Sequence, residues 1–60
     1  MRLRVLTVRD LGAEVRAYVR ADAVTAQITL RLTFPRPAGA GKAELWRRAR
    51  IETLKYLDIA

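Results

Sequence analysis

The sequence predicts an α+β fold in which a three-stranded antiparallel meander is followed by one C-terminal helix packed on its apolar face. The main observation is a change of hydrophobic period at Pro35. Before Pro35, apolar residues recur at every second position, as in strands with one buried and one solvated face. After it, they recur at helical spacing. A second observation is length, because 60 residues make one small domain, 1–60, with a marginal core.

The first two strands are predicted at 2–9 and 13–20, joined by a three-residue loop that ends in Gly12. Hairpin loops of this length favour glycine at the last position, where the backbone is left-handed. Such a loop pairs Arg9 with Ala13. This register turns the odd-numbered residues of both strands toward the core.

The third strand is predicted at 24–34, where every even-numbered residue is apolar. A tight turn joins it to the second strand, with a four-residue loop as the alternative, and both choices bury the same faces. The tight turn pairs Val15 with Leu30 and brings Glu14 opposite Arg31, a favourable cross-strand charge pair.

The third strand ends at Pro35, because proline has no N–H to donate to a neighbouring strand. The segment 35–41 is predicted to be a linker, and the helix is predicted at 42–58. No Ser, Thr, Asp or Asn stands directly before this helix, so its first turn lacks a side-chain cap.

The composition argues against an enzyme. The chain has no cysteine and no histidine, which removes disulfides, thiolate zinc sites and the commonest general base. Its six carboxylates do not form an acid–base pair in the predicted fold. The glycines before the helix resemble the end of a phosphate-binding loop, but Arg36 and Ala43 stand where that motif needs Gly and Ser or Thr. We therefore expect no catalytic residue, metal, cofactor or small-molecule substrate.

No segment predicts a signal peptide or a membrane span, because charges interrupt the N-terminus and the longest uncharged run is short. We expect a cytoplasmic protein with no membrane partner, or a virion protein if a bacteriophage encodes it. The net charge of +6 indicates an anionic partner. An arginine-rich composition inherited from a GC-rich genome is the alternative explanation.

The solvated face of the predicted sheet is a candidate DNA-binding surface. It displays five arginines around Tyr18, against the single acid Glu14; the arginines are Arg2, Arg4, Arg16, Arg20 and Arg31. Arginine beside an aromatic ring can contact phosphates and base edges.

The predicted order of three strands and one helix resembles two DNA-reading families. These are the plant ethylene-response-factor domain and the arm-binding domain of tyrosine recombinases, which lay a three-stranded sheet into the major groove with a helix behind it. The resemblance covers topology and length, and no functional residue is carried over from either family.

Leu6, Val8 and Tyr18 favour a different use of the same face. In the predicted register Leu6 and Val8 point outward beside Tyr18, and outward apolar residues indicate a protein contact. The alternative is a bulge near Leu6 that turns Leu6 and Val8 inward.

The leading hypothesis is therefore a small structural or assembly protein, of bacteriophage or mobile-element type. It would act as a homo-oligomer or by docking on a larger protein partner, since a small core and two open strand edges favour association. The alternative hypothesis is a DNA-binding module that uses the arginine-rich sheet face.

Overall fold

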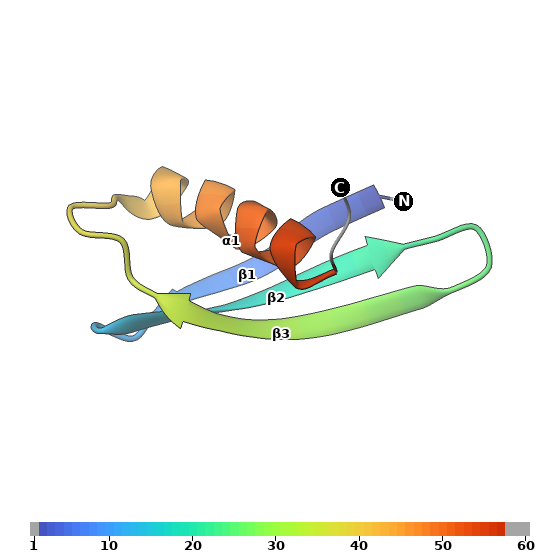
Figure 1. Ribbon diagram of the computed structural model, residues 1–60, viewed down its shortest axis with the longest axis horizontal. Helices are drawn as coiled ribbons and strands as arrows, with labels where there is room; N and C mark the ends of the chain where they lie inside the picture. Colours follow the sequence, from blue (N-terminus) through green and yellow to red (C-terminus); the bar gives the residue numbers. More distant parts are fainter. Residues whose placement is uncertain (1, 58–60) are drawn as a thin grey trace.

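The computed structural model describes residues 2–57 and has three strands followed by one helix (Figure 1). The strands β1 (Arg2–Asp10), β2 (Glu14–Asp22) and β3 (Gln27–Pro35) form an antiparallel sheet in the order β1-β2-β3. The helix α1 (Lys42–Tyr56) lies across one face of this sheet. The predicted α+β meander with a C-terminal helix is confirmed.

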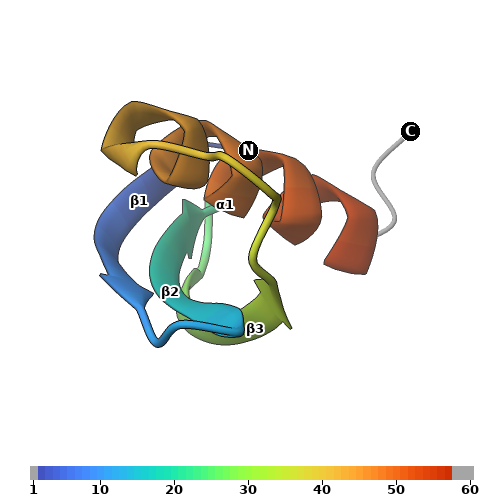
Figure 2. The ribbon, with the colours of Figure 1, turned by 90° about the vertical axis from the view of Figure 1, so that its left-hand side faces the viewer.

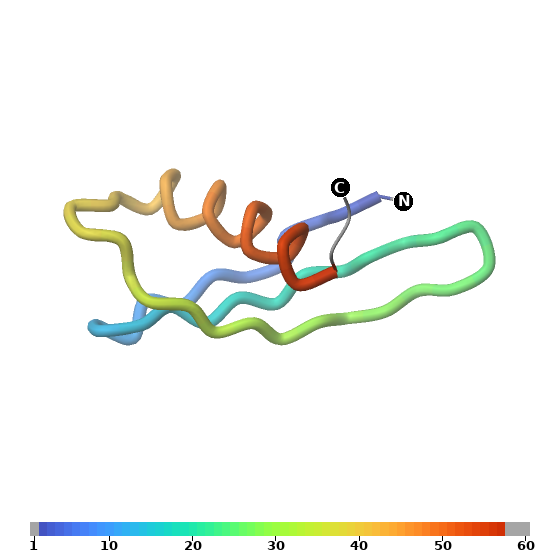
Figure 3. The backbone as a smooth tube through the Cα atoms, in the orientation of Figure 1, coloured from blue at the N-terminus to red at the C-terminus, as the bar shows by residue number. Residues whose placement is uncertain are grey.

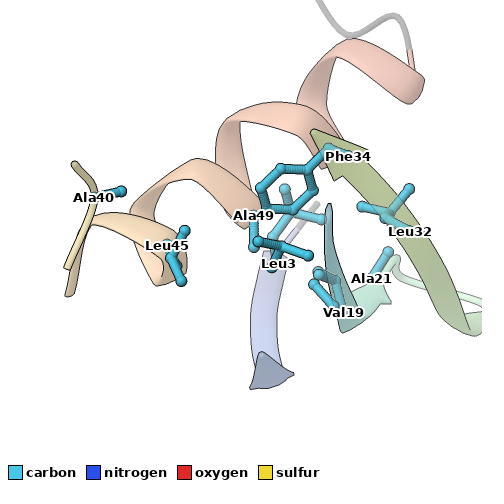
Figure 4. Packing of buried hydrophobic residues seen from close by; sticks show 10 residues of the cluster. Leu3, Val19, Ala21, Leu32, Phe34, Ala40, Leu45 and Ala49 are labelled. Atoms are coloured by element: carbon cyan, nitrogen blue, oxygen red, sulfur yellow. The ribbon is translucent and has the colours of Figure 1, made fainter. Parts of the chain in front are cut away.

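The core lies between α1 and the covered face of the sheet, which we call the inner face. The helix contributes one buried stripe with a spacing of four residues: Leu45, Ala49 and Thr53. The Thr53 hydroxyl donates to the Ala49 carbonyl oxygen at 2.8 Å, so this buried polar group has a partner. From the sheet, Leu3 and Phe34 pack toward Ala49 (Figure 4).

The pairing of β1 with β2 differs from the predicted register. Arg9 lies opposite Arg16 instead of Ala13, a displacement of three residues beside the turn. An irregularity between Val5 and Thr7 then changes the register along the strand. The predicted register has one continuous ladder; the irregularity that breaks it lies at Leu6, where the alternative prediction placed a bulge.

The bulge reverses the faces of β1 because it adds one residue, Leu6, to a ladder in which side chains alternate. Before the bulge, Leu3 and Val5 face the core as predicted. After it, Val8 packs against the core and Arg9 points outward.

The pairing of β2 with β3 is displaced by four residues from the prediction, so Val15 lies opposite Phe34 instead of Leu30. The connecting loop takes up residues 23–26, closed by an Ala23 N–H bond to the Ala26 carbonyl oxygen, and β3 therefore begins three residues later than predicted. A displacement by an even number keeps the faces, so the even-numbered residues of β3 belong to the inner face as predicted.

The displacement also removes the predicted charge pair between Glu14 and Arg31. Glu14 lies opposite Pro35, and Arg31 lies opposite Tyr18. This register places Phe34, near the end of β3, in the core against α1 (Figure 4).

The β2–β3 hairpin extends past the C-terminal end of α1 (Figures 1 and 3). Val24 in its loop is fully exposed, and Ile28 is 54% exposed although it belongs to the inner face. The helix begins at Lys42 as predicted, and Gly41 before it provides no side-chain cap, which was also predicted; the predicted helix end at residue 58 lies outside the described residues. Within residues 2–57, no helix has the length and apolar content needed to cross a bilayer.

The turn between β1 and β2 is built around Asp10. Gly12 has φ = 97°, the left-handed conformation that its position in the loop predicted. The Gly12 N–H donates to Asp10 Oδ1 at 2.9 Å, and Arg36 Nε donates to Asp10 Oδ2 at 2.9 Å. Because Arg36 also donates to the Ala40 carbonyl oxygen at 2.8 Å, Asp10 ties the turn to the linker before α1.

These contacts predict an acid-dependent loss of stability. The Gly12 N–H, followed by Arg36, lowers the pKa of the Asp10 carboxyl below its ordinary value of 3.8. The stabilisation is therefore present at neutral pH and is lost as the pH falls through the lowered pKa. We expect Asp10→Asn to lower the urea midpoint at pH 7 and to lower it less as the pH falls through the lowered pKa of Asp10, because the wild-type carboxyl then becomes neutral as well. An equal difference throughout this pH range would contradict a role for the carboxylate charge.

Candidate nucleic-acid interface

The sheet face opposite α1, which we call the outer face, carries a dense group of arginines. Its residues alternate along each strand with buried ones such as Val15, Ala17 and Val19. The strands bow away from the helix, so the outer face is convex (Figure 1). Six arginines belong to it: Arg2, Arg4, Arg9, Arg16, Arg20 and Arg31.

Strand pairing arranges the outer face in rows that run across the sheet. In the central row, Tyr18 lies between Thr7 and Arg31, and its side chain is 38% exposed. The two flanking rows each hold two arginines and one threonine; they are Arg4, Arg20 and Thr29 on one side, and Arg9, Arg16 and Thr33 on the other. An exposed aromatic ring therefore lies between two strongly basic rows.

The flanking rows place like charges directly opposite each other. Arg4 faces Arg20, and Arg9 faces Arg16, across the β1–β2 ladder. Directly opposed like charges in a sheet are destabilising, by roughly the 0.2–1 kcal/mol that an opposite-charge pair contributes. The fold thus holds two unfavourable pairs that a bound anion would relieve.

Two carboxylates, Asp22 and Glu14, belong to the outer face and offset only part of its charge. Asp22 Oδ1 lies 3.0 Å from Arg20 Nε, in a partly exposed ion pair. On Arg16, Nε is buried and has no hydrogen-bond partner within residues 2–57. Buried polar atoms are usually satisfied, so this Nε is an exception within the described residues.

The helix side of the molecule is basic as well, since α1 carries five cations against Glu44 and Glu52; the cations are Lys42, Arg47, Arg48, Arg50 and Lys55. Arg47 Nη1 lies 3.5 Å from Glu44 Oε1, and Lys55 Nζ lies 3.4 Å from Glu52 Oε2. Both pairs are three residues apart, where helical side chains are neighbours. Positive charge is therefore present on both sides of the molecule, and the outer face differs in setting arginines directly opposite one another.

The structure places all five sequence-predicted arginines and Tyr18 on this one face. It adds Arg9, which the sequence analysis had turned inward, and the acid Asp22, which had been placed in a turn. The sequence does contain a signal that Arg9 faces outward, because the adjacent apolar residues Val5 and Leu6 interrupt the alternation before Val8.

The predicted protein-contact patch of Leu6, Val8 and Tyr18 does not form on the outer face. Val8 packs against the core, so its predicted outward orientation is wrong. Leu6 is the extra residue of the bulge and is 40% exposed, and Thr7 lies opposite Tyr18 in the place expected for the apolar neighbours. The alternative prediction was a bulge near Leu6 that turns both side chains inward. It is correct for Val8, which packs against the core, and wrong for Leu6, which is exposed.

Comparison of the chain with protein-family models, with curated proteins and with solved structures finds no match. A functional proposal therefore rests on the residues of the outer face themselves.

Proposed function

We propose that this protein is a nucleic-acid-binding module that places the outer face of its sheet against duplex DNA. The observation that carries the proposal is the pair of arginine-rich rows on either side of Tyr18. A purely solvated face gains nothing from directly opposed arginines, whereas phosphate groups between them convert repulsion into attraction.

The residue types on this face match the contacts that DNA offers. Arginine donates in pairs to phosphate oxygens and to the O6 and N7 atoms of guanine in the major groove. The threonines at 7, 29 and 33 add hydroxyls that bind phosphate oxygens and methyl groups that contact thymine. In this binding mode Tyr18 contacts base edges, and Arg31 and the other arginines of the outer face contact the two phosphate backbones.

The proposal predicts a steep dependence of DNA affinity on salt. The logarithm of the binding constant falls with a slope of about −0.9 per neutralised phosphate, so six phosphate contacts give a slope of about −5. We expect Arg31→Ala to weaken binding of a short duplex at every salt concentration and to make this slope shallower by about one, because one phosphate contact is lost. Fluorescence anisotropy with a labelled duplex measures both quantities.

Arg47→Ala is the matched control, because Arg47 lies on the helix beside Glu44 and away from the outer face. It removes the same charge and should leave the salt slope unchanged. Wild-type binding with a slope near zero, or equal losses in Arg31→Ala and Arg47→Ala, would show that the outer face does not bind DNA.

A second candidate function is assembly through self-association. The specific observation in its favour is the free edge of β3. This strand carries one charged residue, Arg31, and includes the exposed Ile28. Long edge strands with few charges readily add another strand.

A further inference from the structure

The two edges of the sheet are protected to very different degrees. β1 carries three arginines and a bulge, both of which discourage pairing with another chain. Arg50 Nη1 also donates to the Leu3 carbonyl oxygen at 3.2 Å, which occupies part of the β1 backbone. β3 has nine residues in regular pairing with β2, and within residues 2–57 no strand lies on its other side.

The backbone groups that β3 offers at its free edge follow from the ladder. Bonds from Ala23 N–H to the Ala26 carbonyl oxygen and from Arg36 N–H to the Ala13 carbonyl oxygen fix which facing pairs are hydrogen-bonded. Hydrogen-bonded pairs alternate along an antiparallel ladder, so the even-numbered residues of β3 bond to β2. The odd-numbered residues present N–H and C=O groups outward, except for Pro35, which has no N–H.

We propose that two copies of this chain pair antiparallel along their β3 edges, with a two-fold axis at Leu30. Thr29 then lies opposite Arg31 of the partner subunit, and Gln27 lies opposite Thr33 of the partner subunit. The register provides eight inter-chain backbone hydrogen bonds, two for each of the four facing pairs formed by Gln27, Thr29, Arg31 and Thr33.

Charge selects this register over its neighbour. A two-fold axis at Arg31 uses the same outward groups but sets Arg31 directly against the partner's Arg31. The axis at Leu30 separates these charges and gives each arginine a threonine opposite.

Apolar contacts on the inner face add to the backbone bonds. In this register Ile28, which is 54% exposed in the single chain, lies beside Leu32 of the partner subunit. Leu30 meets the partner's Leu30 at the axis. The C-terminal end of α1 also extends past the β3 side of the sheet (Figure 2).

The paired molecule is a six-stranded sheet with both helices on one side and both outer faces on the other. The dimer does not rest on the proposed DNA binding, because its contacts are backbone groups and inner-face residues. A two-fold axis would double the arginine-rich surface and match a palindromic site, as dimeric DNA-binding proteins do.

Single-cysteine variants test the register, since the chain has no cysteine of its own. Under oxidation we expect Leu30→Cys to form a disulfide-linked dimer. We expect a mixture of Gln27→Cys and Thr33→Cys, both on the exposed outer face, to give mainly the mixed dimer. Faster linking of Thr29→Cys with Thr33→Cys, a pair that faces only when the axis lies at Arg31, would overturn the register with its axis at Leu30.

Proline at the free edge tests the interface without disturbing the single chain. Thr29 N–H points away from β2, so Thr29→Pro removes an inter-chain donor and no donor of the β2–β3 ladder. Light scattering should give twice the 6.8 kDa chain mass for wild type and for the control Thr29→Val, and the chain mass for Thr29→Pro. A monomeric wild type at millimolar concentration would refute the dimer. The DNA affinity of monomeric Thr29→Pro, compared with that of dimeric Thr29→Val, which lacks the same hydroxyl, shows whether the outer face acts alone.

Discussion

Phe34→Ala is expected to lower the free energy of unfolding by about 3–5 kcal/mol at 25 °C. Phe34 is 4% exposed and lies in the core between the end of β3 and the helix stripe at Ala49 (Figure 4). Truncation of a buried phenylalanine costs about 3–5 kcal/mol through lost transfer energy and a residual cavity. Domains are stabilised by about 0.05–0.15 kcal/mol per residue, or about 3–9 kcal/mol for a chain of this size. One substitution therefore removes a third or more of the stability.

Urea unfolding followed by circular dichroism measures this loss. Val24→Ala is the matched control, because Val24 is fully exposed in the β2–β3 loop and its truncation should cost less than about 0.5 kcal/mol. Similar midpoints for Phe34→Ala and Val24→Ala would contradict the packing of α1 on this part of the sheet.

The fold could be predicted from the sequence because each element has a pattern that depends only on nearby residues. Alternation through β3 and the four-residue spacing of Leu45, Ala49 and Thr53 report local periods, and Pro35 separates them. Gly12 marks a left-handed turn residue in the same local way. The prediction that the even-numbered residues of β3 face inward is correct although the register was wrong, because a shift by four residues preserves alternation.

The wrong predictions, which are the strand registers and the faces of β1 after Leu6, depend on contacts between residues far apart in the sequence. The β2–β3 register is set by where Phe34 meets Val15 beneath the helix, and no local pattern encodes that alignment. The bulge at Leu6 is partly local, since Val5 and Leu6 are adjacent apolar residues, but its position depends on how β1 fits β2. Arg9 was assigned to the wrong face for this reason, and so was Val8.

More of the candidate DNA-binding surface than of the protein-contact patch could be predicted from the sequence. Arg16, Arg20 and Arg31 lie on strands whose faces the alternation fixes, so their grouping around Tyr18 follows from the sequence. The proposed patch depended on β1 beyond Leu6, the one place where the alternation changes phase.

The double variant Arg4→Thr, Arg9→Thr should make the protein more stable and a weaker DNA ligand. Each substitution removes one member of a facing pair, Arg4 from Arg20 and Arg9 from Arg16. Relief of each repulsion should add roughly 0.2–1 kcal/mol to the free energy of unfolding, and threonine suits an exposed strand position. Loss of two phosphate contacts should reduce the salt slope of DNA binding by about two.

The matched control is Arg47→Ala, Lys55→Ala, which removes the same net charge from the helix. These side chains lie beside Glu44 and Glu52, so the control should leave stability and the salt slope nearly unchanged. If both double variants weaken DNA binding equally, only net charge matters and the outer face has no special role. Opposite effects on stability and binding in the strand variant alone would mean that the sheet retains unfavourable arginine pairs because a bound polyanion uses them.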